Sequence, residues 1–386
     1  MLHDRYAGRA ARAAFVWIAL ASAGAAAFAQ AGQGSGAEPH APAASSALKD
    51  PFVDPLDASA LKYPRVAGRP VMAVARAGTR LVAVGMRGLI AVSDDEGKTW
   101  TQVGAPVRSD LLALAFPNAT DGWIVGHDGV VLHTADGGRT WTRQLDGRMA
   151  ATTLAAYYKQ KIAAGDTALQ PFLDQLMLNY REGPSLPLLS VAFSDASHGM
   201  AVGPFGMAIA TDDGGRTWRP MLERFDNPQF LHLNAVFGFG GEVYVAAEQG
   251  TVFRLDLASG RFLAIKTGYA GSFFGVTADE HTLLAFGLRG TIYRSTDQGS
   301  TWTRTPSPLH GAVTGASPVA PLHASNHAFV FVTAAGEAAL YDAGENRYKL
   351  LDVGRPSVLT GVLSLSDGAL AVTSLAGPSV ASTSTH

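Results

Sequence analysis

Short apolar runs separated by glycine-bearing turns recur along most of the chain. Four pairs of runs precede the same polar turn, and they read RLVAVGMRGLIAVSDD, GWIVGHDGVVLHTAD, GMAVGPFGMAIATDD and LLAFGLRGTIYRSTD. Runs rich in Val, Ile, Leu and aromatic residues, punctuated by Gly, are typical of short strands joined as hairpins. The pattern therefore predicts pairs of antiparallel strands repeated through the sequence.

The polar turn that follows each pair is itself a repeat. It reads SDDEGKTW at 93–100, TADGGRTW at 134–141, TDDGGRTW at 211–218 and STDQGSTW at 295–302. Successive copies begin 41, 77 and 84 positions apart, which fits a unit of 41 to 42 residues with about 36 extra residues between the second and third copies. A unit of that length matches the four-stranded blade of a β-propeller.

Further units without the turn raise the number of blades to seven. Segments 242–265 and 328–351 keep the strand pattern, and 359–374 begins another unit. The sequence therefore predicts an all-β, seven-bladed β-propeller, with a six-bladed ring as the alternative. The expected blades span about 70–104, 110–145, 187–223, 232–266, 272–306, 311–353 and 357–383. Segment 61–66 is expected to supply the outer strand of the seventh blade, because this pairing would close the ring.

The repeated turn follows the pattern S/T-x-D-x-G-x-T-W, called the Asp-box. Its carboxylate can accept hydrogen bonds from backbone N–H groups of the turn, its Gly can adopt a positive φ, and its Trp can fill the space between blades. We therefore assign a structural role to the acids and tryptophans of the boxes, in preference to a carbohydrate or calcium site. These residues are Asp95, Trp100, Asp136, Trp141, Asp213, Trp218, Asp297 and Trp302.

The extra residues between blades two and three, 146–187, have a helical pattern. Their apolar positions form two adjacent i, i+4 rows, which are Leu169, Leu173 and Met177, and Phe172, Leu176 and Tyr180. We predict a helical hairpin with helices at about 150–163 and 167–181. Gly165 would end the first helix, and Asp166 or Thr167 would cap the second. Long insertions in repeat proteins usually lie on the binding face.

The N-terminal region has the features of an export signal. Arg5, Arg9 and Arg12 precede the apolar run 13–28, and AFA at 27–29 provides a signal-peptidase site. We therefore expect a signal peptide at 1–29, a flexible leader at 30–55 and the propeller at 56–386; an uncleaved anchor is the alternative. The mature protein would be periplasmic or secreted and would not span the membrane.

Composition and charge narrow the possible functions. The chain has 386 residues, a formal net charge of −2 and no cysteine. These values exclude disulfides and thiolate chemistry and argue against a nucleic-acid partner. The histidines are scattered, and the loose spacing of His310, His323 and His327 lacks a helical context, with His323 and His327 expected in loops; we therefore predict no metal site and no cofactor. The GFGG stretch at 238–241 is expected to be a hairpin turn and not a phosphate loop.

Four Asp-boxes in units of the form VGxxGxIxxSxDGGxTW resemble the BNR-type propellers, and more closely the photosystem II stability/assembly factor family. The resemblance covers about 71–374 and implies seven blades. It also implies a protein-binding role in the cell envelope. In bacteria without photosynthesis such exported proteins are often encoded near resistance–nodulation–division-type exporters, which implies an accessory role with a membrane transporter as partner.

The turns between the second and third strands of the blades should converge around one mouth of the central channel, on the same face as the insertion. Arg87 and Arg289 occupy the same slot in two blades, and arginine in this slot resembles the arginine patch with which the assembly-factor family is thought to hold its partner. His127, Phe205 and Gln249 stand where further basic residues would be expected. The predicted partner-binding residues are Arg87, His127, Asp128, Phe205, Glu248, Gln249, Arg289, Tyr157, Phe172 and Tyr180.

An enzymatic function finds little support in the residues. Sialidase chemistry needs three arginines, a tyrosine nucleophile with a glutamate base, and an acid, and an Arg-Ile-Pro element precedes the first box in such chains. The segment LKYPRVAGRPVMAVAR has no such element. No motif selects a pair of carboxylates for glycoside hydrolysis. We therefore predict a non-enzymatic scaffold that binds a cell-envelope protein; the alternative is a carbohydrate-active propeller, either a sialidase-like glycosidase or a lectin.

Overall fold

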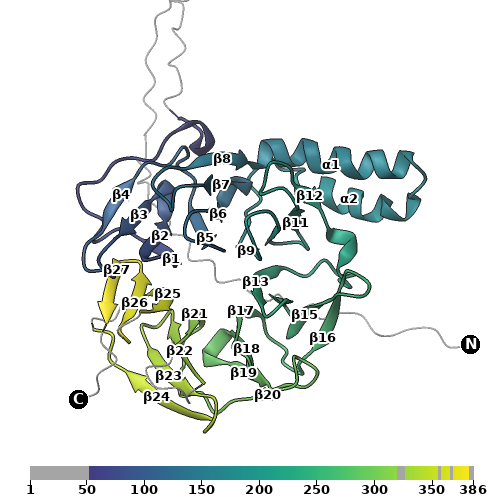
Figure 1. Cartoon of the computed structure of the whole chain (residues 1–386). Coiled ribbons are helices and arrows are strands. Elements are labelled where there is room, and N and C mark those ends of the chain that lie inside the picture. The colour runs from purple at the N-terminus through teal and green to yellow at the C-terminus, as the bar shows by residue number, and fades with distance from the viewer. Residues whose placement is uncertain (1–51, 320–326, 355–357, 366–367, 382–386) are drawn as a thin grey trace, which may run out of the picture. The chain divides into compact units, whose positions relative to one another are not determined.

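The strands form seven antiparallel sheets that surround a central channel (Figure 1). The computed structural model describes residues 52–319, 327–354, 358–365 and 368–381. The predicted signal peptide at 1–29 and residues 30–51 of the predicted leader lie outside them, as does His323. The seven-bladed propeller with a helical insertion is confirmed, and the six-bladed alternative is wrong.

Each sheet follows chain order from the channel outward. Blade one contains β1 (Val71–Ala77), β2 (Arg80–Gly85), β3 (Ile90–Ser93) and β4 (Thr101–Val103); blade two contains β5 (Leu111–Ala115), β6 (Gly122–Gly126), β7 (Val131–Thr134) and β8 (Thr142–Leu145). Blade three contains β9 (Ser190–Phe193), β10 (Gly199–Val202), β11 (Ala208–Thr211) and β12 (Arg219–Pro220); blade four contains β13 (Leu233–Phe239), β14 (Glu242–Ala247), β15 (Thr251–Asp256) and β16 (Arg261–Lys266). Blade five contains β17 (Phe273–Ala278), β18 (Leu283–Gly287), β19 (Ile292–Ser295) and β20 (Thr303–Arg304); blade six contains β21 (Val313–Pro318), β22 (Ala328–Thr333), β23 (Ala338–Asp342) and β24 (Arg347–Leu351). Blade seven contains β25 (Leu359–Ser364), β26 (Leu370–Ser374) and β27 (Gly377–Ala381).

The seventh sheet has three strands within the described residues, so the prediction that 61–66 adds a fourth is wrong. This segment runs beside blade one instead, because the Gln102 side chain accepts a hydrogen bond from Tyr63 N (2.8 Å) and donates one to Leu61 O (2.8 Å). The open edge strand β27 contains Pro378, which lacks an N–H group. A proline at an edge suits a strand that has no outer neighbour.

Side chains near the start of the innermost strands tie neighbouring blades together. Thr360 donates a hydrogen bond to Val71 O (2.6 Å) and so joins blade seven to blade one. Asn234 and Thr314 make the equivalent bonds, each to the first residue of the next blade's innermost strand. All three residues lie at a register shift, which six of the innermost strands share. The ring is therefore closed by side chains as well as by packing.

The Asp-boxes form the expected turns between the third and fourth strands. In the first box Ser93 Oγ accepts the N–H of Gly97 (2.8 Å), and Asp95 accepts both the N–H (2.8 Å) and the hydroxyl (2.6 Å) of Thr99. The indole of Trp100 donates to Gly97 O (3.0 Å). The other three boxes repeat the two bonds between threonine and aspartate. The box carboxylates therefore hold their own turns.

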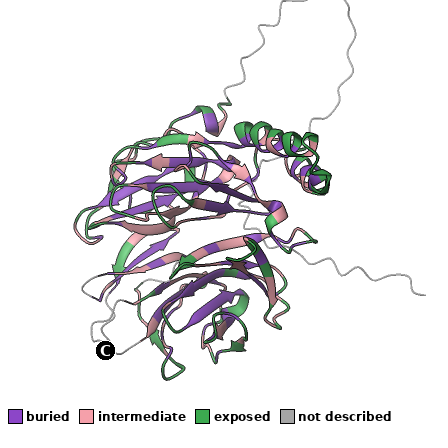
Figure 2. Cartoon of the chain, turned by 45° about the vertical axis from the view of Figure 1, so that its right-hand side comes forward, coloured by how far each residue is buried: buried purple, intermediate pink, exposed green. Residues whose placement is uncertain are grey.

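The insertion consists of two helices that pack on the side of the ring. Helix α1 (Gly147–Ala163) and helix α2 (Gln170–Asn179) are joined by Gly165, with φ 109°, and by a 3₁₀ turn at Thr167–Leu169. Asp146 caps α1 by accepting the N–H of Met149 (3.0 Å). Buried positions of the helices face the sheets and exposed positions face outward (Figure 2). The predicted hairpin is confirmed, but α2 begins at Gln170, so the expected cap of this helix at Asp166 or Thr167 is wrong.

Candidate partner-binding face

The turns between the second and third strands share one unusual backbone geometry. Arg87, Asp128, Phe205, Gln249 and Arg289 all have φ between 54° and 59°, and each precedes a glycine that also has a positive φ. Two successive residues with positive φ define a type I′ turn, the connection that best matches the twist of a short hairpin. We call the face formed by these turns and by the connections between blades the turn face.

The glycine of each turn is required because the neighbouring connection approaches closely. A Cβ atom at Gly290 would lie 1.7 Å from Leu309 O, and one at Gly250 would lie 1.9 Å from Tyr269 O. The residue before the glycine must then occupy the exposed corner of the turn. In five of the seven blades the fold therefore places one variable side chain at the same corner of the turn face.

The carboxylates near these turns accept hydrogen bonds from backbone or side-chain groups of adjacent segments. Asp110 accepts the N–H of Arg87 (2.7 Å), and Glu248 accepts the N–H of His232 (2.8 Å). Asp128 accepts the hydroxyl of Ser109 (2.6 Å). Of the predicted contacts, Asp128 and Glu248 therefore have structural partners already, and sequence reasoning did not foresee this because the partners come from the preceding connection.

Glu337, in the corresponding turn of blade six, is held in the same way. Partial burial raises the pKa of Glu337, but hydrogen bonds from the Gly311 N–H (2.9 Å), the Thr333 hydroxyl (2.9 Å) and His310 outweigh this effect and lower it. The carboxylate is therefore ionised at neutral pH, with its charge stabilised by donors from the same surface.

Arg87 and Arg289 differ from these acids because their guanidinium groups are exposed and have no partner. No ion pair or hydrogen bond joins either guanidinium to another part of the chain that the structure describes. Each side chain stands at the corner of its I′ turn, one in blade one and the other in blade five. In the described part of the turn face these two guanidinium groups are therefore unpaired, whereas the four carboxylates of Asp110, Asp128, Glu248 and Glu337 accept hydrogen bonds.

The helical hairpin is anchored to the propeller by a buried tyrosine. Tyr158 is fully buried, donates a hydrogen bond to Glu223 Oε2 (2.6 Å) and accepts the N–H of Leu222 (3.1 Å). Burial, and then the nearby Glu223 carboxylate, raise the pKa of Tyr158. Leu154 and Leu176 are also fully buried. One side of the hairpin is therefore committed to the propeller.

Other parts of the hairpin remain available at the surface. Met177 and Leu178 are 52% and 51% exposed. Phe205 is 47% exposed, and its carbonyl accepts a hydrogen bond from Asn179 of α2 (3.3 Å).

The structure brings some of the predicted contacts together and separates others. Phe205 lies against His232, with ring centroids 4.7 Å apart, and Phe172 lies against Phe230 at 6.3 Å. These rings form an aromatic group where α2 meets blade three. His127, Gln249, Tyr157 and Tyr180 lie in other parts of the turns and the hairpin, and Arg87 and Arg289 belong to blades that are not neighbours.

Sequence reasoning missed an ion-pair cluster that fixes the N-terminal segment. Arg148 of α1 lies 2.6 Å from Asp54 and 2.9 Å from Asp57. Between these acids, the fully buried Leu56 accepts a hydrogen bond at its carbonyl from Arg143 (2.8 Å). The only sequence signal was the pair of acids flanking a lone apolar residue, which did not indicate a partner some 90 residues away.

The described residues contain no group of three or more His, Asp or Glu placed to hold a metal ion.

The acids of the Asp-boxes have lowered pKa values. Hydrogen bonds from Thr99, led by its hydroxyl, lower the pKa of Asp95 to about 2, and the threonine of the fourth box does the same for Asp297. At Asp136 burial raises the pKa, but the box threonine outweighs it and lowers the value to about 2. No helix in the described part of the chain is long and apolar enough to cross a membrane.

The fold and the boxes define the class of protein as a seven-bladed Asp-box propeller that offers a loop-rich face and a helical insertion. A family model described as "Photosynthesis system II assembly factor YCF48" matches residues 74–162 and 182–317, more than half of the chain. The chain therefore belongs to this family, and the resemblance seen in the boxes is confirmed.

Curated proteins with similar sequences are named as Ycf48 assembly proteins. The photosystem II assembly protein Ycf48 of Synechococcus sp. (strain JA-2-3B'a(2-13)) is 30% identical over 171 residues, covering 40% of this chain and 49% of the relative. The photosystem II assembly lipoprotein Ycf48 of Synechococcus sp. (strain CC9902) is 27% identical over 167 residues, covering 42% and 48%. The chain thus spans about half the length of the curated relatives it matches.

Solved structures share the architecture. A structure described as YCF48 bound to D1 peptide aligns with a TM-score of 0.60 and 15% identity, covering 84% of this chain and 99% of that chain. YCF48 from Cyanidioschyzon merolae aligns with a TM-score of 0.57 and 14% identity, covering 82% and 96%. At these identities the likeness shows the fold alone.

Proposed function

We propose that this protein is a non-enzymatic scaffold of the cell envelope that holds a segment of a membrane protein against its turn face. The observation that carries the proposal is that two arginines of that face lack hydrogen-bond partners while its acids have them. Arg87 and Arg289 present unpaired guanidinium groups, whereas the neighbouring carboxylates already hold backbone N–H groups. Free guanidinium groups suit a segment that bears carboxylates, because Arg binds them with two parallel hydrogen bonds.

The relatives support a peptide as the partner and an exported location. A solved relative is described as bound to D1 peptide, and one curated relative is named as a lipoprotein. This chain has no cysteine to carry a lipid. We therefore propose export to the periplasm through the N-terminal signal peptide. The partner we propose is a membrane transporter, with an exporter of the resistance–nodulation–division type as the first candidate.

The aromatic group at α2 extends the proposed contact surface. Phe205 is half-exposed beside Asn179, and Leu178 is exposed on the same helix. Exposed aromatic side chains and arginines are typical of the residues that dominate protein interfaces. We therefore propose that the partner segment contacts blade three and α2 as well as the two arginines.

The experiment replaces Phe205 with a photoreactive phenylalanine and irradiates cells that express the protein from its native locus. We expect a specific membrane protein to be crosslinked and the crosslink to be lost in the Arg87→Glu/Arg289→Glu variant. The matched control is Arg304→Glu/Arg347→Glu, which makes the same charge change at exposed arginines on outer strands. This control should leave the crosslink unchanged.

The probe placed at Phe239, at the end of β13 and 39% exposed, serves as the control for the opposite face. A crosslink from Phe239 and none from Phe205 would overturn the choice of face. Hydrolysis of fluorogenic glycosides by the purified protein would instead support the carbohydrate-active alternative.

A further inference from the structure

The central channel holds a cavity of about 810 Å³ that opens on the face opposite the turn face. We call this face the box face, because the four Asp-boxes lie there together with the turns between the first and second strands. Phe239, Gly240 and Gly241, at the tip of the first hairpin of blade four, line the cavity and are exposed. The cavity is therefore reached without the turn face, and what it binds is independent of the proposed function.

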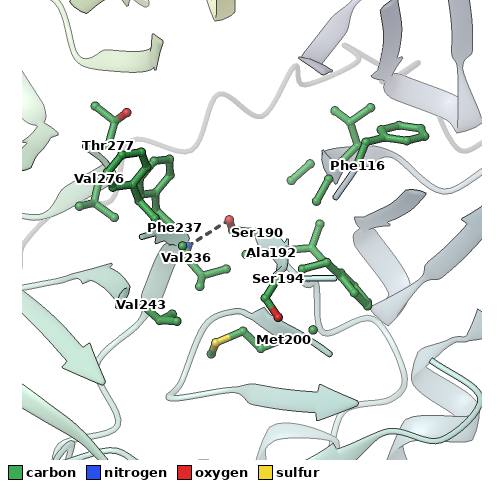
Figure 3. Close-up of a pocket in the computed structure, with 18 of the residues that line it drawn as sticks. Phe116, Ser190, Ala192, Ser194, Met200, Val236, Phe237, Val243, Val276 and Thr277 are labelled. Atoms are coloured by element: carbon green, nitrogen blue, oxygen red, sulfur yellow. Dashed lines mark hydrogen bonds between the residues drawn. The ribbon is translucent and has the colours of Figure 1, made fainter. Parts of the chain in front are cut away.

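All seven blades contribute residues of their innermost strands to the wall of the cavity. The wall begins just past the register shifts of these strands, at Ala73 and Ala113, and continues toward the box face. Figure 3 shows Phe116 on one side of the open space and Phe237 on the other, with Ala192 between them. The innermost strands therefore surround one space along the axis of the ring.

The wall of the cavity is mostly apolar and has no unpaired charge. The innermost strands contribute mainly Ala, Val, Leu and Phe to it, and no Arg, Lys, Asp or Glu among the residues the structure describes. The charged residues at its rim each have a partner: Glu242 with Arg254 (2.9 Å), Asp212 with Arg219 (2.7 Å) and His198 with Asp195 (2.9 Å). An ionised ligand would therefore find no free counter-charge in the described wall.

Two serine hydroxyl groups of the wall join neighbouring blades. Ser190 Oγ accepts the N–H of Val236 (3.1 Å) and so links blades three and four. Ser317 Oγ accepts the N–H of Ser364 (3.3 Å), which links blades six and seven, and donates to Pro318 O (3.1 Å). These hydroxyl oxygens have partners already, so the surface offered to a ligand is mainly hydrocarbon.

The dimensions of the cavity favour an elongated molecule over a helical segment. In blade three the wall runs from Ser190 to Ser194, which at about 3.3 Å per residue is about 16 Å of strand. The volume of 810 Å³ divided by this length gives a mean cross-section of about 50 Å². An α-helix about 10 Å across fills about 80 Å² and is too wide, whereas a hydrocarbon chain is narrower than the cavity.

We propose that this cavity binds a neutral, elongated and largely apolar small molecule, of the class that a long-chain alcohol represents. Its volume lies within the range of small-molecule sites, which are mostly apolar with few polar groups. Water gains few hydrogen bonds from such a wall, whereas an apolar ligand removes hydrocarbon surface of both partners from water. The wall also selects against charged ligands, because burying an unpaired charge is costly.

The test measures the binding of N-phenylnaphthylamine, a neutral apolar dye that fluoresces on leaving water, to the mature protein. Dodecanol and dodecanoate, which have the same chain length, are then added as competitors at a pH where dodecanoate is ionised. We expect saturable dye binding that dodecanol displaces. Dodecanoate should displace the dye at least about tenfold less well, a difference of about 1.4 kcal/mol.

Variants that fill the channel locate the bound dye. Ala192→Phe and Ala316→Phe add a ring to the wall in blades three and six, and each should weaken dye binding at least about tenfold. Ala192→Leu fills less of the space, perturbs folding less and should give an intermediate loss. Ala258→Phe is the matched control, because it adds the same ring at an exposed residue outside the channel, and it should leave binding unchanged.

Exposed leucines on the outside of blade four offer the dye another place to bind. Leu257 and Leu263 are 68% and 47% exposed. Weaker dye binding in Leu257→Ala/Leu263→Ala would place the dye on this outer surface and overturn the proposal. The proposal also fails if the dye does not bind saturably, if dodecanoate competes as well as dodecanol, or if the folded filled variants bind like the wild type.

Discussion

The hydroxyl group of Tyr158 fastens the helical insertion to blade three, and the Tyr158→Phe variant tests this attachment. The substitution keeps the buried ring and removes only the hydroxyl. It deletes a hydrogen bond to the Glu223 carboxylate (2.6 Å) and leaves the N–H of Leu222 without its acceptor (3.1 Å). No change in packing is needed, so the effect isolates these two bonds.

The two hydrogen bonds of the Tyr158 hydroxyl determine how much the substitution should lower the free energy of unfolding. A hydrogen bond to a charged group contributes about 1.5–3 kcal/mol, and a buried donor left without an acceptor costs about 1–3 kcal/mol. The Glu223 side chain is 20% exposed and can regain a hydrogen bond from water, which reduces the first value. We therefore expect Tyr158→Phe to lower the free energy of unfolding by about 2–3 kcal/mol.

Equilibrium unfolding in urea, followed by circular dichroism, measures the change. Tyr157→Phe is the matched control, because the Tyr157 hydroxyl has no hydrogen bond to any residue the structure describes; it should change the free energy by less than about 0.5 kcal/mol. A double-mutant cycle with Glu223→Gln should show coupling between the two positions. If Tyr158→Phe costs no more than Tyr157→Phe, the hydroxyl does not anchor the insertion.

Three further predictions concern the ring. Because the folded pKa of Asp95 is about 2, below its ordinary value near 3.8, its stabilising contribution is present above pH 4 and is lost as pH falls toward 2; Asp95→Asn should flatten this dependence in acid unfolding curves. Thr360→Val removes the bond to Val71 O and should cost about 1–2 kcal/mol in urea unfolding, whereas no change would refute its role in closing the ring. Gly290→Ala, whose Cβ would lie 1.7 Å from a backbone oxygen, should lower the thermal midpoint far more than Gly240→Ala, which has a similar φ and open space; equal effects would show that φ alone decides.

The fold could be predicted because its signals are local. Each box fixes its turn with residues at most eight positions apart, and the strand pairs are adjacent hairpins. The helical hairpin was also predictable from i, i+4 spacing. Segment 61–66 was misplaced because its position depends on Gln102, about 40 residues away, and an apolar pattern carries no information about such a partner.

The candidate sites could be predicted only in part. The slots of Arg87 and Arg289 follow from the repeat, since the glycine of each I′ turn fixes the residue before it. The hydrogen bond from the His232 N–H to the Glu248 carboxylate was not predictable, because it joins a turn to the preceding connection between blades.

The three-stranded seventh blade affects how the protein responds to a pull on its N-terminus. In a ring closed by an N-terminal strand, tension on that end would load a β-ladder directly. Here the chain enters along the outside of blade one, held by side chains such as Arg148 and Gln102 and by backbone hydrogen bonds. These backbone bonds join Arg108 N to Pro55 O (2.8 Å), Ala60 N to Ala105 O (3.1 Å) and Gly68 N to Ala376 O (2.8 Å). Tension on the N-terminus would break these contacts one after another and leave every sheet intact. Residues 52–68 would therefore detach from the propeller before any blade unfolds.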